Sequence, residues 1–561
     1  MIKNLLPALI AICITMNMEA RDTPFGFLMT QQQLDHCGLM EIETFDHAAL
    51  LEEDAINEHN GGRTRTGRIA FVDNLDATNC GTWFTLENGD KVWILHFRTM
   101  HALATNVYFD NLSLPQGSSL FLYSADRSYF EGPYTMEDCN EHGRTATAEV
   151  FGDEAYLEYY EPAGVVAQPS IGILGIGHLY NHVHDYRDEN RGGGSDFCEV
   201  DVNCPEGDAW VQQRDAVIRL TLVDGGSQYL CSGAFVNNVE MDCTRYILTA
   251  FHCTIGISDD DLLLCTVRFN YQKASCATGS VPSQNKTGVF MIANSDDDGG
   301  DEGSDFALLE LEDTIPASWD VFYAGWDATT ATPQTGVGIH HPAGDVKKIS
   351  TCDDVVSSGW GAANTHWRTN WIETETEWGV TEGGSSGSPF YNQDKRIVGQ
   401  LTGGGSCCTT NGCGQGTGPT QDDYYGKMKN NWNGNPNAVA LELRTWLDPN
   451  NTGTLIMDGA YANTDLAQPC TPFVGVEELL TFNDVLVFPS ASAGTINVQT
   501  EKYYNINEVN IFDNAGALVG SYKLNSNTTV LDLSAHASGF YFITFTHANG
   551  NQLTKKFTIV K

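Results

Sequence analysis

The chain has 561 residues, and its 30 lysines and arginines against 72 aspartates and glutamates give a net charge of −42. This charge argues against a nucleic acid or an anionic membrane as partner, because both would be repelled. At roughly 150 residues per domain, the length predicts three or four domains. With 18% charged residues, 41% hydrophobic residues and 56 glycines, the composition is that of a globular protein rich in strands and turns.

Residues 1–20 have the features of a secretory signal peptide. Lys3 precedes an apolar run from Leu5 to Met18, and the small Ala20 comes before charged residues. The run is shorter than the ~18 to 20 residues that span a bilayer, and no later segment is long enough, so we expect no transmembrane segment. Sixteen cysteines would be unusual in a reducing cytosol, and we interpret them as disulfide partners.

Strand-like runs separated by turns occupy residues 21–191. The runs at residues 91–97, 106–109 and 119–123 are rich in β-branched and aromatic side chains with period-two patterning. This pattern predicts a β-sandwich. A glycine-rich stretch follows Arg191 and is either an ordinary linker or a processing site.

The same pattern recurs near the C-terminus and predicts a second, small β-sandwich over residues 476–561. Its expected strands cover residues 495–499, 508–512, 529–533, 539–545 and 556–560. Residues 460–475 are poor in apolar side chains and contain Pro469 and Pro472, so we interpret them as a linker.

A candidate general base follows an apolar run in the middle of the chain. Residues 245–251 predict a strand that ends at His252, and Cys253 comes directly after it. A general base needs a fixed orientation, which a disulfide at the next residue would provide. A lone histidine is more often structural, so the hypothesis depends on two further segments.

The second segment is a glycine-rich turn, residues 382–389, that contains Ser386. In such a turn the backbone N–H groups of Gly384 and Ser386 can point at one spot and stabilise an oxyanion, each typically contributing ~10² to 10³ in rate. Without a histidine partner, the same turn would be an ordinary surface loop.

The third segment places Asp305 at the start of an apolar run. A carboxylate there can accept the imidazole N–H and fix its tautomer. The chain order His252, Asp305, Ser386 is that of chymotrypsin-like enzymes and differs from subtilisin and the α/β-hydrolases. This chemistry uses no cofactor and no metal. The acidic run at residues 295–303 lacks the ligand spacing of an EF-hand, and we interpret it as a solvated loop rather than a calcium site.

Several motifs in the middle of the chain carry a resemblance to a known family. They are Cys198-Glu-Val-Asp-Val-Asn-Cys204, Leu248-Thr-Ala-Phe-His-Cys253, Ser304-Asp-Phe-Ala-Leu-Leu309, Gly384-Ser-Ser-Gly-Ser-Pro389 and Trp446-Leu-Asp-Pro449. On these motifs, residues 198–459 resemble the bacterial lysyl endopeptidases, which are secreted trypsin-like serine proteases. The resemblance implies His252 as base, Asp305 as orienting acid and Ser386 as nucleophile.

The fold class implied by the resemblance is mainly β. We expect a two-barrel chymotrypsin-like protease domain over residues 192–459, flanked by an N-terminal β-sandwich pro-domain and the small C-terminal β-sandwich. The resemblance also implies the disulfides Cys198–Cys408, Cys204–Cys276 and Cys231–Cys253. It assigns no partners to Cys243, Cys265, Cys352, Cys407 and Cys413.

Asp423 matches the family's aspartate at the base of the pocket for the side chain before the scissile bond. Leaving a desolvated carboxylate unpaired costs about 3 to 5 kcal/mol, which favours a lysine or arginine substrate. A solvated acidic turn is the alternative. The family's strand histidine is Thr402 here, and its pocket tryptophan aligns with Trp360 only after a shift of two residues. We therefore expect cleavage of protein or peptide substrates after lysine, with arginine as the alternative.

Two rival functions remain open at this point. One is a catalytically silent protein that binds basic peptides on the same scaffold. The other is a glutamyl endopeptidase, which has a similar serine turn but whose acidic substrates a negative Asp423 would repel.

The C-terminal sandwich resembles the sorting domains of the type IX secretion system, on motifs that include Val485-Leu-Val-Phe-Pro489 and Ala537-Ser-Gly-Phe-Tyr-Phe542. The resemblance implies the type IX machinery as partner. It also implies export through the periplasm of a bacterium with an outer membrane, to the cell surface or the medium. A generic adhesive sandwich is the alternative. We expect residues 21–191 to be a propeptide that covers the cleft until cleavage near Arg191.

Overall fold

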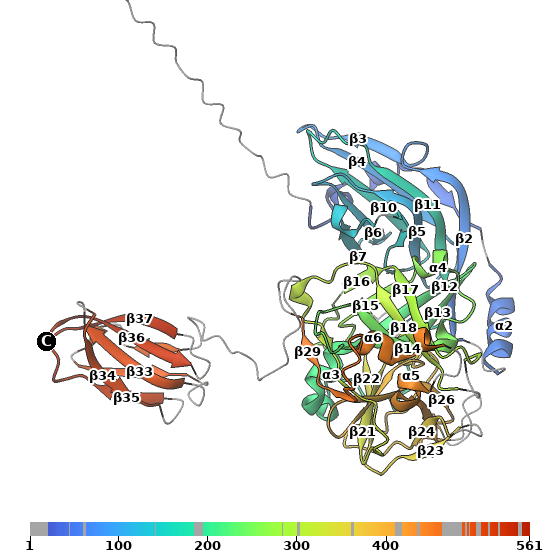
Figure 1. Cartoon of the computed structure of the whole chain (residues 1–561). Helices are drawn as coiled ribbons and strands as arrows, with labels where there is room; N and C mark the ends of the chain where they lie inside the picture. Colours follow the sequence, from blue (N-terminus) through green and yellow to red (C-terminus); the bar gives the residue numbers. More distant parts are fainter. Residues whose placement is uncertain are drawn as a thin grey trace, which may run out of the picture. The chain divides into compact units, whose positions relative to one another are not determined.

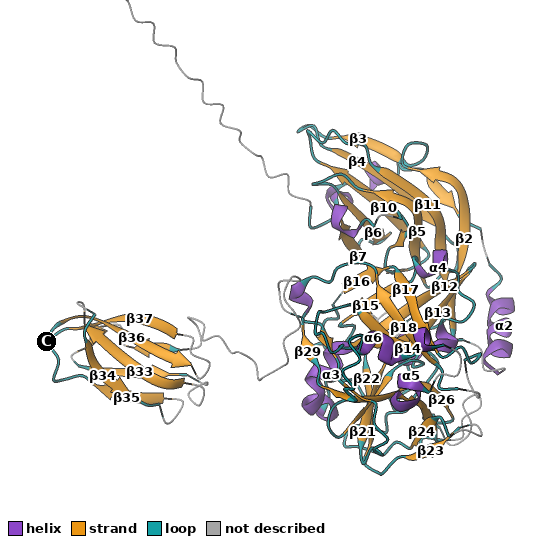
Figure 2. Cartoon of the chain, in the orientation of Figure 1, coloured by secondary structure: helices purple, strands orange, loops and turns teal. Residues whose placement is uncertain are grey.

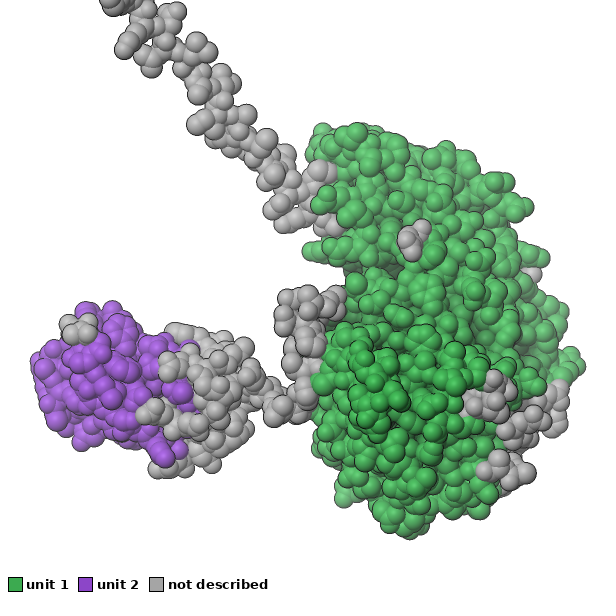
Figure 3. Space-filling model, viewed as in Figure 1, with its two compact units in different colours: residues 1–472 green, residues 473–561 purple. Residues whose placement is uncertain are grey.

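The computed structural model is mainly β and divides into two compact units, residues 1–472 and 473–561 (Figures 2 and 3). It describes residues 21–561 apart from 44, 60–62, 141, 184–193, 283, 300–302, 361–363, 410–417, 435–437, 463–484, 489–490, 493, 501–505, 514–515, 525–527 and 548–551. The predicted signal peptide, Arg191 and most of the predicted linker lie outside the described residues. None of the described helices has the length and apolar character needed to cross a membrane.

The N-terminal part of the first unit is a β-sandwich, as predicted (Figure 1). One sheet contains β1 (Leu39–Glu41), β3 (Thr82–Thr85), β4 (Lys91–Arg98), β10 (Glu154–Glu161), β6 (Ser119–Ser124) and β7 (Phe130–Tyr134). The facing strands are β2 (Arg65–Asp76), β11 (Ser170–Leu179), β5 (Ala104–Ser113), β8 (Thr145–Ala146) and β9 (Val150–Phe151). Trp93 and Leu157 of the first sheet share a core with Phe109 and Ile173 of the second.

Two helices of this part were not predicted, α1 (Gln31–Leu34) and α2 (His47–His59). Helix α2 is held to the strands by the buried Asp54. Its carboxylate pairs with Arg65 of β2 at 3.0 Å and accepts a hydrogen bond from the Tyr180 hydroxyl at 2.8 Å. These contacts join segments far apart in the sequence, so a local pattern does not reveal them.

Strand β2 continues from the sandwich into the next part of the chain. It pairs with β11 along one edge and, at its N-terminal end, with β13 (Ser227–Phe235). The sandwich and the following barrel therefore share one 12-stranded sheet.

Strands β12 to β18 form the first barrel of residues 192–459, the predicted protease region. Their bounds are β12 (Val217–Asp224), β13 (Ser227–Phe235), β14 (Tyr246–Ala250), β15 (Thr266–Phe269), β16 (Gln284–Thr287), β17 (Val289–Asn294) and β18 (Phe306–Leu311). The pairing order is β16-β15-β12-β13-β14-β18-β17. Only Gly288, with a φ of +95°, separates β16 from β17, so the ring of strands closes at this glycine. Helices α3 (Val211–Ala216) and α4 (Asp259–Leu262) flank the barrel.

A nine-stranded sheet forms the second part of the protease region. Its strands are β20 (Trp326–Asp327), β21 (Gly336–His340), β22 (Lys348–Cys352), β23 (Ser357–Gly359), β24 (His366–Thr369), β25 (Pro389–Asn392), β26 (Ile397–Gly404), β27 (Asp423–Lys427) and β28 (Ile456–Met457). Helices α5 (Met428–Asn433) and α6 (Leu443–Leu447) follow β27. The buried side chains of Met428 and Leu447 share a core with Trp326.

The predicted linker begins two residues too early. Ala460 and Tyr461 form β29 (Ala460–Tyr461), which pairs with β19 (Phe322–Tyr323) of the protease region. Ala460 is buried, and the Tyr461 hydroxyl donates a hydrogen bond to Asp215 at 2.9 Å. This pairing partner lies well over a hundred residues away in the sequence, so the low apolar content of the segment concealed it.

The second unit is a small sandwich, as predicted. One sheet is β30 (Leu486–Phe488), β32 (Thr495–Gln499) and β35 (Thr528–Asp532). The other is β31 (Ala491–Ser492), β37 (Gln552–Ile559), β36 (Gly539–His547), β33 (Ile506–Asp513) and β34 (Leu518–Tyr522). Buried Val498, Leu531, Ile511 and Ile543 connect the two sheets.

The structure contains the three disulfides that the family resemblance implies. Cys198 bonds to Cys408, Cys204 to Cys276, and Cys231 to Cys253. Cys243 and Cys407 are also disulfide-bonded. In the described part of the chain, Cys37, Cys80, Cys139, Cys265 and Cys352 carry free thiols.

Candidate active site

His252 lies directly after β14 and is held by the carboxylate of Asp305. The backbone N–H of His252 donates to Oδ1 of Asp305 at 2.8 Å, and its ring Nδ1 lies 2.7 Å from Oδ2. With both carboxylate oxygens engaged, the imidazole plane is fixed. Because the Asp305 carboxylate accepts a hydrogen bond from Nδ1–H, the other ring nitrogen, Nε2, is the one that can accept and return a proton.

The sequence places Asp305 at the mouth of β18, where its backbone has a φ of +54°. Aspartate tolerates this left-handed conformation better than most residues. The Asp305 carbonyl accepts hydrogen bonds from Phe251 at 2.9 Å and from the Gln400 side chain at 3.3 Å. Gln400 belongs to β26, so Asp305 is held from both parts of the protease region.

The acidic run before Asp305 is only partly the solvated loop that the sequence suggested, because Asp296 and Asp298 are exposed but two other residues are not. Ser295 and Asp297 are buried. Asp297 accepts hydrogen bonds from the Ser295 hydroxyl at 2.6 Å and from the backbone N–H of Asp305 at 2.9 Å. A Cβ atom on Gly299 would lie 2.7 Å from Cβ of His252, so the loop packs directly against the histidine. Asp297 therefore supports the backbone of Asp305.

The pKa of His252 is raised from its ordinary value of 6.5. Burial alone would lower the pKa, because it disfavours the imidazolium. The charge of Asp305 and its hydrogen bond outweigh burial, and the charge of Asp297 acts in the same direction, whereas Arg63 opposes it.

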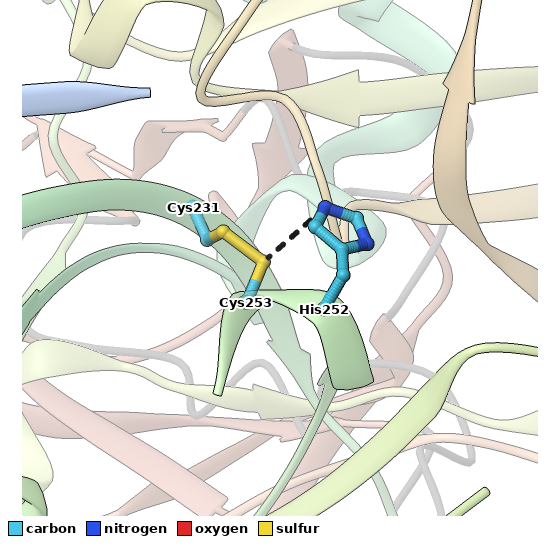
Figure 4. Close-up of side chains that lie close together, drawn as sticks. All are labelled: Cys231, His252 and Cys253. Carbon is cyan, nitrogen blue, oxygen red and sulfur yellow. Dashed lines mark hydrogen bonds between the residues drawn. A yellow bond between two sulfur atoms is a disulfide. The ribbon is translucent and has the colours of Figure 1, made fainter. Parts of the chain in front are cut away.

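The disulfide Cys231–Cys253 lies beside the histidine, as Figure 4 shows. Sγ of Cys253 is 4.0 Å from Nε2 of His252. Both sulfurs are oxidised to a disulfide and offer no thiolate, so these side chains do not make a metal site. The bond instead ties the end of β14 to β13.

The turn that contains Ser386 packs against the same two strands. The Ser386 carbonyl accepts a hydrogen bond from the Ser232 N–H at 2.8 Å. Gly387 has a φ of +81°, and a Cβ atom there would lie 2.1 Å from the Thr249 hydroxyl and 2.8 Å from the N atom of Ala250. Only glycine allows this approach. The backbone of Ser386 is thereby brought beside the strand that leads to His252.

Two backbone N–H groups of this turn are oriented by their neighbours. The N–H of Ser385 donates to the Glu382 carbonyl, and that of Gly387 to the Leu401 carbonyl. Within the described part of the chain, the N–H groups of Gly384 and Ser386 donate to no other protein atom. They are the pair that the sequence identified as oxyanion donors.

His340 holds the turn from behind, and the sequence interpretation did not foresee this role. Its Nδ1 lies 2.8 Å from the Ser385 hydroxyl and its Nε2 lies 2.9 Å from the Ser350 hydroxyl. Burial lowers the pKa of His340 to about 3, so the ring is neutral and bridges the two hydroxyls.

Asp423 is fully buried at the start of β27. It accepts hydrogen bonds from Trp371 Nε1 at 2.6 Å, from the Thr381 hydroxyl at 2.8 Å and from the Ser406 hydroxyl at 2.6 Å. Thr381 leads directly into the serine turn. Burial raises the pKa of Asp423, and its hydrogen bonds only partly oppose this. In the described residues no lysine or arginine forms an ion pair with it, so the solvated acidic turn does not describe Asp423.

Thr402 and Trp360 both contact His366, a histidine that the sequence analysis did not identify. The Thr402 hydroxyl lies 2.8 Å from Nε2 of His366, and the Trp360 ring lies 5.6 Å from the His366 ring. His366 is buried on β24. A histidine from another strand of the same sheet therefore contacts Thr402, the residue aligned with the family's strand histidine. Its only sequence signal is its place within the short run Thr365-His-Trp-Arg-Thr369.

Comparison with known proteins agrees with this geometry. Residues 192–426 match the family model "Lysyl endopeptidase, C-terminal domain", and residues 486–560 match "Secretion system C-terminal sorting domain". A curated lysyl endopeptidase of Pseudomonas aeruginosa is 28% identical over 312 residues, which is 53% of this chain and 64% of that protein. Residues 192–426 are thus similar to the C-terminal domain of lysyl endopeptidases, and residues 486–560 are similar to a type IX sorting domain, which indicates export to the cell surface or the medium.

Two solved structures also match part of this chain. An inactive serine-to-alanine mutant of Rv3671c from M. tuberculosis H37Rv has a TM-score of 0.25 and 13% identity, covering 45% of this chain and 93% of that one. The thermostable serine protease AL20 from an extremophilic microorganism has a TM-score of 0.28 and 11% identity, covering 39% of this chain and 93% of that one.

Proposed function

We propose that residues 192–459 form a serine endopeptidase that cleaves peptide bonds after lysine. The observation that carries this proposal is the double contact of His252 with the buried Asp305, in a region that matches the lysyl endopeptidase family. The structural contacts that bring the Ser386 turn beside β14 support the same assignment.

In the proposed mechanism Oγ of Ser386 attacks the peptide carbonyl while Nε2 of His252 takes the hydroxyl proton. Asp305 stabilises the imidazolium that results, and the N–H groups of Gly384 and Ser386 stabilise the oxyanion. His252 then gives its proton to the leaving amine, and an acyl-enzyme remains. A water molecule, deprotonated by His252, releases the acid in the second half of the reaction.

Asp423 is the residue that would give the enzyme its preference for a basic residue before the scissile bond. A buried carboxylate without a basic partner from the described chain favours a substrate ammonium or guanidinium that can supply one. The name of the curated relative favours lysine. The cluster of Trp360, His366 and Thr402 lies on the same sheet and is assigned to the pocket wall.

We also propose that residues 21–191 are a propeptide removed near Arg191, and that the chain ends with the sorting domain that the type IX machinery recognises. The test of the enzyme assignment is a fluorophosphonate probe with mass-spectrometric mapping of the adduct. We expect one adduct, on Ser386, and a loss of ~10⁴- to 10⁶-fold in kcat for Ser386→Ala. A protein that binds basic peptides but takes up no probe would instead be the silent binding protein.

A further inference from the structure

The edge of β13 carries, side by side, the catalytic turn and a segment from the N-terminal domain. Residues Ser227 to Tyr229 pair with β2, and the N–H of Leu230 donates to the Thr64 carbonyl at 3.1 Å. Cys231 comes next and bonds to Cys253, after which Ser232 binds the Ser386 carbonyl. Along β13, the pairing with β2 and Thr64 thus ends at Leu230, and the contact with the serine turn begins two residues later, at Ser232.

Two side chains of this segment contact the site itself. A Cβ atom on Gly383, the residue before the oxyanion donor Gly384, would lie 2.2 Å from the Thr64 hydroxyl. Arg63 donates a hydrogen bond to the Cys253 carbonyl at 3.2 Å and forms an ion pair with Asp224. Its guanidinium lies 4.1 Å from the centre of the Tyr229 ring. Arg63 therefore contacts the residue that follows the histidine, and Thr64 lies against the serine turn.

The chemistry of the proposed reaction indicates which part of a substrate belongs there. His252 must reach the leaving amine to protonate it, so the residues after the scissile bond lie on the side of His252 and its disulfide. The pocket assigned to Asp423 contains the start of β27, Ser406 just after β26 and Thr381 just before the serine turn, on the other part of the protease region.

We propose that Arg63 to Arg65 occupy the surface that binds the substrate residues following the scissile bond, and so block extended peptides in the uncleaved chain. This inference rests on the proposed function of the same site. An extended peptide binds such an edge by adding a strand to the sheet, and the Thr64 carbonyl makes the main-chain contact that such a peptide would make.

The segment is held in its extended conformation from the opposite side. Asn57 of α2 donates to the Arg63 carbonyl at 2.9 Å, and the buried Arg65 pairs with Asp54 of the same helix. Arg65 also contacts the Tyr229 hydroxyl at 3.4 Å. A preordered occupant loses little entropy on binding, and its covalent tether keeps it at an effective concentration on the order of millimolar.

The test uses the full-length chain with Ser386→Ala, which cannot process itself or its ligand. Fluorescence anisotropy measures the affinity of two peptides that share the residues up to a lysine. One ends at the lysine, and the other continues for three residues beyond it. We expect the double variant Arg63→Ala, Thr64→Gly to bind the longer peptide roughly 10- to 100-fold more tightly than its parent, and the shorter peptide within about 3-fold.

Arg68→Ala is the matched control. Arg68 lies on the same strand, but its side chain contacts Ser227 and Glu53, away from the serine turn. We expect it to leave both affinities unchanged. If both proteins bind the shorter peptide and also bind the longer peptide with equal affinity, this inference is overturned but the protease assignment is not. If no variant binds either peptide, and the chain with intact Ser386 takes up no fluorophosphonate, the protease assignment fails and the inference with it.

Discussion

The carboxylate of Asp297 accepts a hydrogen bond from the backbone N–H of Asp305 at 2.9 Å, while Asp305 holds His252. The two aspartates form a chain of support in which Asp297 fixes the backbone of Asp305 and Asp305 fixes the imidazole. Burial raises the pKa of Asp297, and the hydrogen bonds from Ser295, Asp305 and Gly299 work against this rise.

Replacing Asp297 by alanine removes this support. We expect kcat/KM to fall about 10- to 100-fold, because misplacement of a positioned base by a fraction of an ångström is costly. Asp297→Asn keeps one oxygen acceptor and should lose less. The exposed neighbour provides the control, since Asp296→Asn should leave kcat/KM unchanged. Equal losses at Asp296 and Asp297 would show that only the charge of the loop matters.

The pH dependence of kcat/KM follows from the raised pKa of His252. Protonated His252 cannot act as a base, and Asp305 stabilises its protonated form, so the activity should fall as the pH drops through a midpoint above 6.5. In Asp305→Asn the negative charge is lost, which should lower the midpoint and reduce kcat by ~10⁴-fold. A pH series of initial rates gives both quantities. An unchanged midpoint in this variant would show that the contact with Asp305 is not what raises the pKa of His252.

Substrate preference should depend on Asp423 and not on its neighbour. For Asp423→Asn we expect kcat/KM on lysine substrates to fall by ~10² to 10³, because the buried counter-charge is lost. The matched control is Asp422→Asn. Asp422 pairs with the half-exposed Arg368 at 2.6 Å, and the exposed pair should contribute little. Similar losses in both variants would place the basic specificity elsewhere.

The disulfide beside the histidine should matter for both stability and catalysis. Removing Cys231–Cys253 with the double variant to serine should cost about 2 to 4 kcal/mol of unfolding free energy. It should also lower kcat, since it releases the end of β14. Removing Cys204–Cys276, which closes a longer loop away from His252, should destabilise the protein at least as much but leave kcat of the folded enzyme near that of the parent. Denaturant unfolding and initial rates measure the two effects separately, and equal kcat losses would contradict the local role.

The sequence was most informative where pattern and chemistry are local. Period-two alternation predicted β4, β6, β32 and β36 close to their observed bounds, and the residue types in chain order predicted His252, Asp305 and Ser386 as a catalytic set. A strand that ends on a histidine and a serine in a glycine turn are recognisable because their chemistry requires those residue types next to one another.

The features that sequence reasoning missed depend on contacts across the fold. His366 reaches Thr402 from another strand, and His340 reaches Ser385 across the sheet, so neither has a local signal. The burial of Asp297 also depends on packing of a loop whose composition suggested solvent. Thr64 lies beside Gly383 only because β2 passes from one domain to the next.

The central claim is that this chain is an endopeptidase that cleaves after lysine because Asp423 binds the lysine side chain. Digestion of a mixed peptide library with the processed protein, followed by mass-spectrometric reading of the new ends, tests it most directly. We predict new C-termini that are almost all lysine, with arginine as the minor product, and no new ends with Ser386→Ala. Cuts without a basic residue before them would contradict the role of Asp423, and cuts that persist in Ser386→Ala would contradict the triad.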